Sequence, residues 1–147
     1  MLIQIALGSL LMLINILITG LSYWGMEVVL VRMRHWLARR PHRPKLTLIL
    51  SAAALWILAQ VTFGVWIWAL TLRALDIFST LEASVYFALT AYTTLGFGDV
   101  LLPEQWRLLG GMAATNGLLS MGLLTAMMVE ALRQVRMIQL KSLESTT

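Results

Sequence analysis

The chain has 147 residues, of which 59% are hydrophobic and only 12% charged, and its mean hydropathy is +0.81. A soluble domain carries about 25% charged residues, so this composition excludes a water-soluble enzyme, whose surface it could not cover with polar side chains. The absence of cysteine excludes disulfide frameworks, thiolate metal sites and catalytic cysteines. The net charge of +4 fits either nucleic acid or a membrane surface, and the positions of the basic residues decide between them.

Three long stretches carry no charged side chain: residues 1–26, 46–72 and 108–129. Each exceeds the roughly 20 residues that an α-helix needs to cross about 30 Å of hydrocarbon. We therefore predict three transmembrane helices. The first lacks the positive start and the cleavage site of a signal peptide, so we expect it to be retained. Asn15 and Gln60 are polar residues within these stretches and are candidates for hydrogen bonds between helices.

Nine of the eleven Lys and Arg residues fall in two segments, one between the first two predicted spans and one after the third. Positive segments of this kind face the cytoplasm. The segment between the second and third spans then faces outside, and it is net acidic. This pattern predicts a multi-pass protein of the cell membrane with its N-terminus outside and its C-terminus in the cytoplasm. The nine residues are Arg32, Arg34, Arg39, Arg40, Arg43 and Lys45, followed by Arg133, Arg136 and Lys141.

The basic linker at residues 32–45 is therefore expected to face the inner leaflet and to contact its anionic lipids. Pro41 and Pro44 are expected to limit any helix to the first part of the linker. A nucleic-acid patch is the alternative for this run, but topogenic arginines beside a membrane are commoner, and we predict no nucleic-acid partner. His35 and His42 have no acidic or cysteine partner beside them, so we expect solvated side chains rather than metal ligands.

A short apolar segment, residues 79–93, lies between the second and third spans. Its first residues, Ser79-Thr80-Leu81-Glu82, fit a capping box, which predicts the start of a helix. This helix is too short to span the membrane and indicates a re-entrant segment. Non-helical backbone at membrane depth is tolerated only where protein buries it or where it lines a watery cavity.

The sequence Thr93-Thr94-Leu95-Gly96-Phe97-Gly98-Asp99 follows this short helix. Glycine at alternate positions permits positive φ, which lets successive carbonyls face one axis and form a site for a dehydrated cation. The hydroxyl of Thr94 adds a further oxygen layer at the inner end. The negative C-terminal end of the preceding helix points toward the same cation.

From about Leu46 to Gln134 the chain resembles the pore of potassium channels, in which four loops reading TVGYG form the filter. Outer helix, pore helix, filter and inner helix follow in the order of that family. The resemblance implies an all-α integral membrane protein with a homotetrameric pore. It also implies a role for each filter residue: Thr94, Leu95, Gly96 and Phe97 supply coordinating oxygens, Gly98 completes the filter, and Asp99 lies at its outer mouth. Phe97 replaces the commoner Tyr and Leu95 replaces Val or Ile, which are departures from the family pattern.

The inner helix is predicted at residues 104–135, with Pro103 near its first turn. Six residues recur at spacings of four and three and share one face: Asn116, Ser120, Leu123, Met127, Glu130 and Gln134. We expect Asn116 and Ser120 at a hydrated cavity, Leu123 and Met127 at a constriction that gates by dewetting, and Glu130 at the inner mouth, where it attracts cations. The alternative is that this face packs against another helix and that Glu130 pairs with a linker arginine. Gly117 and Gly122 are candidates for a hinge or for simple packing.

The predicted organisation is an N-terminal transmembrane helix at 1–31, the linker at 32–45, an ion-channel pore module at 46–135 and a short cytoplasmic tail at 136–147. Within the module the outer helix covers 46–74, the pore helix 79–93, the filter 94–98 and the inner helix 104–135. The first helix lacks the repeated arginines of a voltage sensor.

The predicted function is a potassium channel subunit that conducts K⁺ passively. We expect no catalysis, no cofactor and no small-molecule substrate, because the sequence shows no constellation of nucleophile, base and orienting group. A weakly selective Na⁺/K⁺ channel and a non-conducting accessory membrane subunit stay open as alternatives.

Overall fold

The computed structural model describes residues 1–38 and 42–144, and within them it contains helices and no strand. The predicted all-α fold is therefore confirmed. In chain order the elements are α1 (Leu2–Ala38), α2 (His42–Ala74), α3 (Leu81–Tyr92), the 3₁₀ turn η1 (Glu104–Trp106) and α4 (Arg107–Glu144).

Three of the described helices are long and apolar enough to cross a membrane, over Leu2–Met33, Pro44–Ala74 and Glu104–Leu140. Helix α3 has 12 residues, which is about 18 Å of helix and too short to cross about 30 Å of hydrocarbon. The described part of the chain therefore combines three helices able to span a membrane with one short helix.

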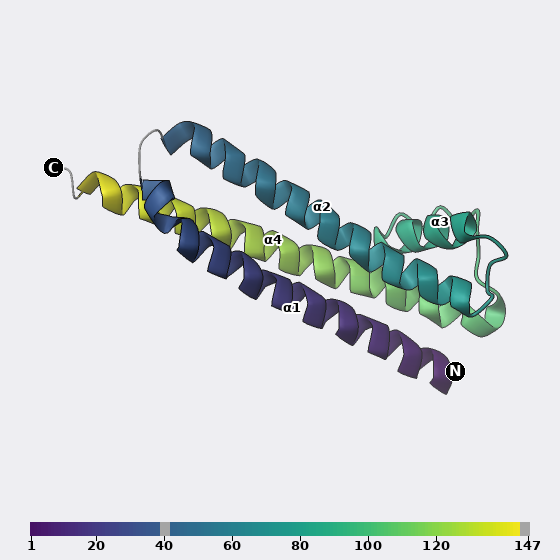
Figure 1. The fold of residues 1–147 in the computed structure, drawn as a ribbon. Helices are drawn as coiled ribbons and strands as arrows, with labels where there is room; N and C mark the ends of the chain where they lie inside the picture. The colour runs from purple at the N-terminus through teal and green to yellow at the C-terminus, as the bar shows by residue number, and fades with distance from the viewer. Residues whose placement is uncertain (39–41, 145–147) are drawn as a thin grey trace.

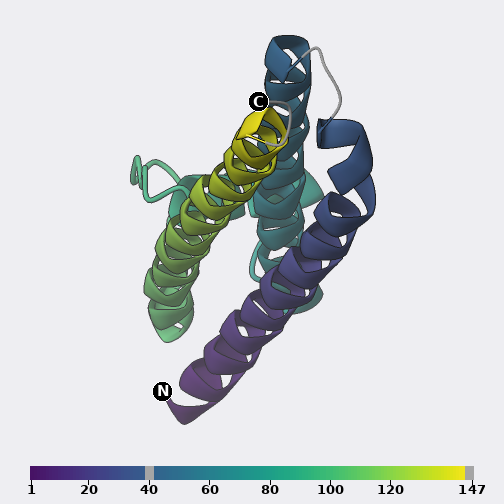
Figure 2. The same cartoon turned by 90° about the vertical axis from the view of Figure 1, so that its left-hand side faces the viewer.

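The three long helices lie side by side, and α3 packs against α2 and α4 at one end (Figure 1). Helices α1 and α4 run in the same direction and α2 runs in the opposite one. The N-terminus lies at the end that holds α3, and the end of α1 and the start of α2 lie at the other end, which also holds the C-terminal part of α4 (Figures 1 and 2). Helix α1 packs mainly on α4 and makes less contact with α2.

Three helix ends differ from the sequence-based expectation by several residues. The first helix continues to Ala38 and the second already begins at His42, so Pro44 lies in the first turn of α2. Proline is tolerated there because the N–H that it lacks would have no partner inside the helix. Helix α4 extends to Glu144, well past residue 135, where we expected the tail to begin. Arg39, Arg40 and Pro41 of the predicted linker fall outside the described residues.

Helix α1 turns its polar side chains inward and its apolar ones outward. Its buried residues lie three or four positions apart and share one face. They are Gln4, Gly8, Leu11, Asn15 and Thr19. Large apolar side chains such as Leu13, Leu17 and Leu21 are more than half exposed in the single chain. This pattern suits a helix whose outer face meets lipid and whose inner face meets other helices.

One of the two predicted polar contacts between helices is present. The side-chain amide of Gln60 on α2 donates a hydrogen bond to the Ser22 hydroxyl on α1. Asn15 instead donates to the carbonyl of Leu11 in its own helix, at 3.2 Å, because it lies in the buried face of α1 where that carbonyl is within reach.

Gln4 joins the first helix to the start of α4. Its side-chain oxygen accepts the N–H of Leu108 at 3.1 Å, and its amide nitrogen donates to the carbonyl of Gln105. The first N–H groups of a helix have no partner within the helix, so Gln4 acts as a cap supplied from a distant part of the sequence. No local pattern in the sequence points to this contact, because the partner of Gln4 lies about a hundred residues further along the chain.

The main hydrophobic core lies at the α3 end of the bundle. It contains residues from all four α-helices, and Trp68, Ala69, Leu72, Ala88 and Leu109 are almost completely buried in it. Because α2, α3 and α4 all contribute, this core fixes the position of α3 and of the loop that follows it.

Replacing Gln4 with Ala removes the side-chain acceptor for the Leu108 N–H at the start of α4. We expect the free energy of unfolding to fall by about 1 kcal/mol, the usual cost of losing a helix cap. The measurement is thermal or denaturant unfolding of the purified protein in detergent, followed by circular dichroism. Ser9→Ala, an exposed position on the same helix, is the matched control and should change stability little. Equal stability of both variants would contradict the capping role.

Candidate functional site

Helix α3 begins with a side-chain cap. The hydroxyl of Thr80 accepts the N–H of Ala83 at 3.2 Å, and the helix proper starts at Leu81. The predicted hydroxyl cap is present, but the capping box is wrong in register. A box needs the acidic residue three positions after the cap, and Glu82 lies two positions after Thr80, so it contributes as a negative charge in the first turn instead.

The C-terminal end of α3 is enclosed between the two helices of the predicted pore module. Tyr92 is 1% exposed, and its phenol lies against Gly64 of α2, where a Cβ would come within 2.4 Å of the hydroxyl. On the other side, a Cβ at Gly117 of α4 would lie 1.8 Å from the Tyr92 carbonyl oxygen. Both helices therefore need glycine at the point of contact. Gly64, Tyr92 and Gly117 form what we call the Tyr92 clamp.

The chain folds back on the end of α3 directly after the clamp. Thr93 donates its N–H to the Leu89 carbonyl at 3.0 Å and its hydroxyl to the same carbonyl at 2.7 Å. The N–H of Gly96 then reaches the carbonyl of Thr90 at 3.1 Å. These bonds use carbonyls of the last helical turn, which otherwise have no backbone partner.

The loop has positive φ at every second residue: 60° at Thr94, 52° at Gly96 and 78° at Gly98. The expectation of positive φ at the two alternate glycines is confirmed. Thr94 was not expected to join them. A β-branched residue with positive φ is rare and costs about 1–2 kcal/mol, so its conformation is held by the surrounding structure. Backbone strain of this kind gathers at functional sites.

The side chains of this loop are largely uncovered within one chain. Leu95 is 60% exposed and Phe97 is 66% exposed. Apolar side chains of this size on a loop that is not a membrane span mark a surface that another protein segment or lipid covers.

Asp99, predicted at the outer mouth, has a specific partner that the sequence analysis missed. The hydroxyl of Tyr86 on α3 donates a hydrogen bond to its carboxylate at 2.5 Å, and its second oxygen accepts the N–H of Val100 at 3.0 Å. The bond from Tyr86 lowers the pKa of Asp99 below its usual 3.8, and the same bond raises the pKa of Tyr86 above 10.0. The signal available in the sequence was Tyr86 itself, an aromatic residue with a polar hydroxyl group in an otherwise apolar short helix.

The acidic residues of this end of the bundle are only partly neutralised. Arg73 pairs with Asp76 at 2.7 Å and Arg107 pairs with Glu104 at 3.5 Å, both on exposed side chains. Glu82 and Asp99 make no ion pair within the described part of the chain, which leaves this end with a negative surface. Such a surface raises the local concentration of cations.

The predicted pore-facing stripe of α4 divides between two environments. Asn116 is completely buried and Ser120 is 2% exposed within the single chain. Within one chain both side chains therefore face neighbouring helices, and their expected place at a hydrated cavity stays a prediction. They lie on the same buried face as Ala113 and Leu124.

The rest of the stripe is also not uniform. Leu123 is 41% exposed, whereas Met127 is partly buried and faces residues of α1 and α2, among them Tyr23 and Ala53. Glu130 accepts hydrogen bonds from Arg133 at 3.0 Å and from Gln134 at 3.2 Å, so its charge has partners on its own helix. Leu123 is the member of the predicted constriction that lies on the open surface of α4.

The candidate ion ligands are backbone and hydroxyl oxygens rather than a cluster of side chains. Within residues 1–38 and 42–144 there is no group of three or more His, Asp or Glu that could hold a metal ion. The alternating backbone conformations at 94–98 are therefore considered below as the candidate arrangement of oxygen ligands.

Substituting alanine at Gly117 and, separately, at Gly122 distinguishes a glycine that is needed for close packing from one that is not. Gly117→Ala forces a Cβ into the Tyr92 carbonyl and should lower the free energy of unfolding by about 2 kcal/mol, as overpacking does. Gly122 has no atom within 4 Å of a built Cβ, so Gly122→Ala should leave stability unchanged or raise it by up to about 1 kcal/mol. Unfolding in detergent measures both. Equal effects of the two substitutions would argue against the Tyr92 clamp.

Removing the Tyr86 hydroxyl tests the bond to Asp99. In Tyr86→Phe the pKa of Asp99 should rise toward 3.8, which carboxyl NMR titration in detergent can follow, and Tyr23→Phe is the control. The native bond needs a charged Asp99 and a protonated Tyr86. Its stabilising contribution is therefore lost as the pH falls through the lowered pKa of Asp99, and again as the pH rises through the raised pKa of Tyr86. An unchanged Asp99 titration would rule the bond out.

Comparison with known proteins gives a family but no individual relative. A family model described as "Ion channel" matches residues 48–134, which is more than half of the chain. This match covers most of α2, the whole of α3, the loop and most of α4. Comparison with curated proteins and with solved structures found no match. Because this family model matches more than half of the chain and three helices are able to span a membrane, the chain belongs to the ion channel family.

Proposed function

We propose that the chain is one subunit of a homotetrameric potassium channel that conducts K⁺ passively. The observation that carries the proposal is the run of alternating positive φ at Thr94, Gly96 and Gly98, directly after a short helix and between two spanning helices. This geometry suits a row of carbonyls that replace the hydration shell of an ion. The carbonyls of Thr94, Leu95, Gly96 and Phe97 and the Thr94 hydroxyl are the proposed ligands, with Gly98 completing the filter.

Tetramer formation is supported by what one chain leaves incomplete. One loop offers oxygens from one side, and a dehydrated cation needs a ring of them. The exposed side chains of Leu95 and Phe97 are the apolar surface that neighbouring subunits would bury. Four copies around a central axis satisfy both needs with a single interface type, as closed symmetry requires.

Electrostatics also favours a cation. Helix α3 ends at Tyr92, so its negative C-terminal end lies next to the first filter residues. Asp99 and Glu82 add net negative charge at the same end of the bundle. An anion channel would need the opposite arrangement, such as a ring of basic side chains.

The proposed orientation follows from the distribution of basic residues. The end of α1, the start of α2 and the last turns of α4 lie at the bundle end opposite α3 (Figure 1), and these segments hold Arg32, Lys45, Arg133 and Arg136. By the positive-inside rule this end faces the cytoplasm, and the loop at 94–99 faces outward across the cell membrane.

Reconstitution of the purified full chain into liposomes tests conduction. We expect Ba²⁺-sensitive uptake of Rb⁺, and bi-ionic reversal potentials that favour K⁺ over Na⁺. Equal permeability to both ions would replace the proposal with a weakly selective cation channel. Absence of flux from a folded protein would replace it with a non-conducting accessory subunit.

Gly96→Ala tests the filter itself. Alanine at φ 52° is strained, and the local conformation should change at a cost of about 1–2 kcal/mol without any steric clash, because a Cβ there has no neighbour within 4 Å. We expect loss of K⁺ selectivity or of flux with helix content unchanged. Gly20→Ala, at a helical position where a Cβ also has open space, is the matched control and should conduct normally. Normal selectivity in Gly96→Ala would contradict the assignment of the filter.

A further inference from the structure

Helix α1, which lies outside the matched ion channel region, is held at its two ends by different helices. At the α3 end of the bundle Gln4 caps the start of α4, and a Cβ at Gly8 would lie 2.4 Å from the sulfur of Met112 on α4. At the other end Lys45, near the start of α2, donates a hydrogen bond to the Trp36 carbonyl of α1 at 2.5 Å. Helix α1 therefore connects the start of α4 with the start of α2.

Helix α1 also lies on the side of α4 that faces away from the loop after α3. Figure 2 shows this loop on one side of α4 and α1 on the other. If the loop lines the pore, as proposed above, α1 lies behind α4 as seen from the pore. A movement of α4 away from the pore axis would therefore push against α1 and α2, because α4 packs on both helices.

A pocket lies between α1, α2 and the distal half of α4, which we define as residues 122–140. It has a volume of about 200 Å³, and its lining includes Met26 and Met33 of α1, Ala53 and Trp56 of α2, and Ala131 of α4. Protein interiors are normally packed without spaces of this size. The pocket therefore provides room into which the distal half of α4 can shift.

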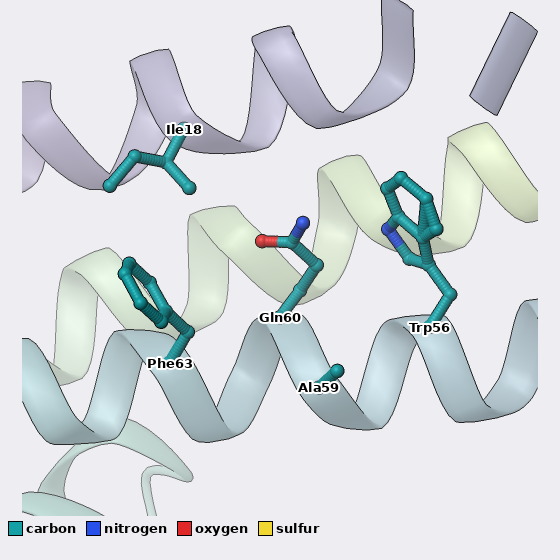
Figure 3. Close-up of a pocket in the computed structure, with 5 residues that line it drawn as sticks. All are labelled: Ile18, Trp56, Ala59, Gln60 and Phe63. Carbon is teal, nitrogen blue, oxygen red and sulfur yellow. The ribbon is translucent and has the colours of Figure 1, made fainter. Parts of the chain in front are cut away.

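A hydrogen bond joins α1 to α2 next to this pocket. The side-chain amide of Gln60 on α2, one turn beyond Trp56, donates to the Ser22 hydroxyl on α1. Figure 3 shows Gln60 extending from α2 into the space between the two helices, with the ribbon of α4 behind it. Beyond this bond lies a second pocket of about 410 Å³, lined by Ile18 of α1 and Phe63 of α2 among others. The bond thus crosses the α1–α2 contact between two loosely packed regions.

We propose that the Gln60–Ser22 bond and the pocket beside Ala131 together set how far the distal half of α4 can move away from the pore axis. This inference rests on the channel function proposed above. A shift of α4 toward the pocket separates α1 from α2 and breaks the bond. In apolar surroundings the separated amide and hydroxyl lose their partner without gaining water. The bond therefore favours the arrangement seen in the structure, and the pocket gives room for the alternative one.

Removing the hydrogen bond tests the first part. Gln60→Leu should raise the Rb⁺ flux of the full chain in liposomes about threefold, the factor that corresponds to a typical hydrogen bond between transmembrane helices. Thr62→Val is the matched control, because the hydroxyl that it removes bonds only to the Leu58 carbonyl of the same helix in the described part of the chain. This control should leave the flux unchanged.

Filling the pocket tests the second part. Ala53→Phe places a ring in the space beside Ala131 and should lower the flux, which is the opposite of the effect of Gln60→Leu. Ala54→Phe is the matched control, since Ala54 is exposed and does not line the pocket, and it should conduct normally. A flux change of the same sign in Gln60→Leu and Ala53→Phe would overturn the proposal.

A distance measurement keeps this test separate from conduction. The chain contains no cysteine, so two spin labels can be attached through Leu21→Cys on α1 and Leu55→Cys on α2, both at exposed positions. Double electron–electron resonance is recorded in liposomes, with the labelled protein diluted by unlabelled protein. We expect Gln60→Leu to broaden the distribution of distances and Ala53→Phe to narrow it.

The two kinds of failure are distinguishable. Absence of flux from the unaltered chain would contradict the channel function. An unchanged distance distribution in folded Gln60→Leu would overturn the role of the hydrogen bond, whatever the flux. If circular dichroism shows that Ala53→Phe does not fold, the comparison of Gln60→Leu with Thr62→Val decides.

Discussion

The close approach of α3 to its two neighbours is the constraint on which the rest of the site depends. The Tyr92 clamp lets the end of a short helix enter between α2 and α4 with no space for a side chain at Gly64 or Gly117. Protein interiors are packed densely enough that a single added methyl group is felt in such a contact. Because Thr93 and Thr94 follow Tyr92 directly, the depth of the loop within the bundle is set by this contact.

The clamp also connects the inner helix with the loop mechanically. Gly117 touches the backbone of Tyr92 rather than a flexible side chain. A displacement of α4 toward α3 at this level would therefore also displace the end of α3. Gly122, five residues further on, has no such neighbour. The contact at Gly117 thus ties α4 to the end of α3, whereas Gly122 faces open space within the single chain.

The main features of this fold were predictable because they follow from composition along the chain. Three uncharged stretches predicted the spans, and the alternate glycines predicted positive φ at Gly96 and Gly98. Contacts between distant residues were not predictable in this way. Nothing local indicates that Gln4 caps a helix that begins about a hundred residues later, or that the buried face of α4 includes Asn116 and Ser120. Helical periodicity groups residues on a face but does not say what that face meets.

In an isolated subunit, only a few hydrogen bonds hold the loop after Thr93 in place. Between residues 95 and 99 the loop is tied to α3 by the bond from Gly96 to Thr90 and by the bond from Tyr86 to Asp99. Segments with few buried contacts open locally at little cost in free energy, and their amides exchange quickly with solvent. Amide hydrogen exchange at these positions would therefore be fast in a lone chain and slow where neighbouring subunits enclose the loop. The rate of exchange would then report assembly, residue by residue, without any ion being present.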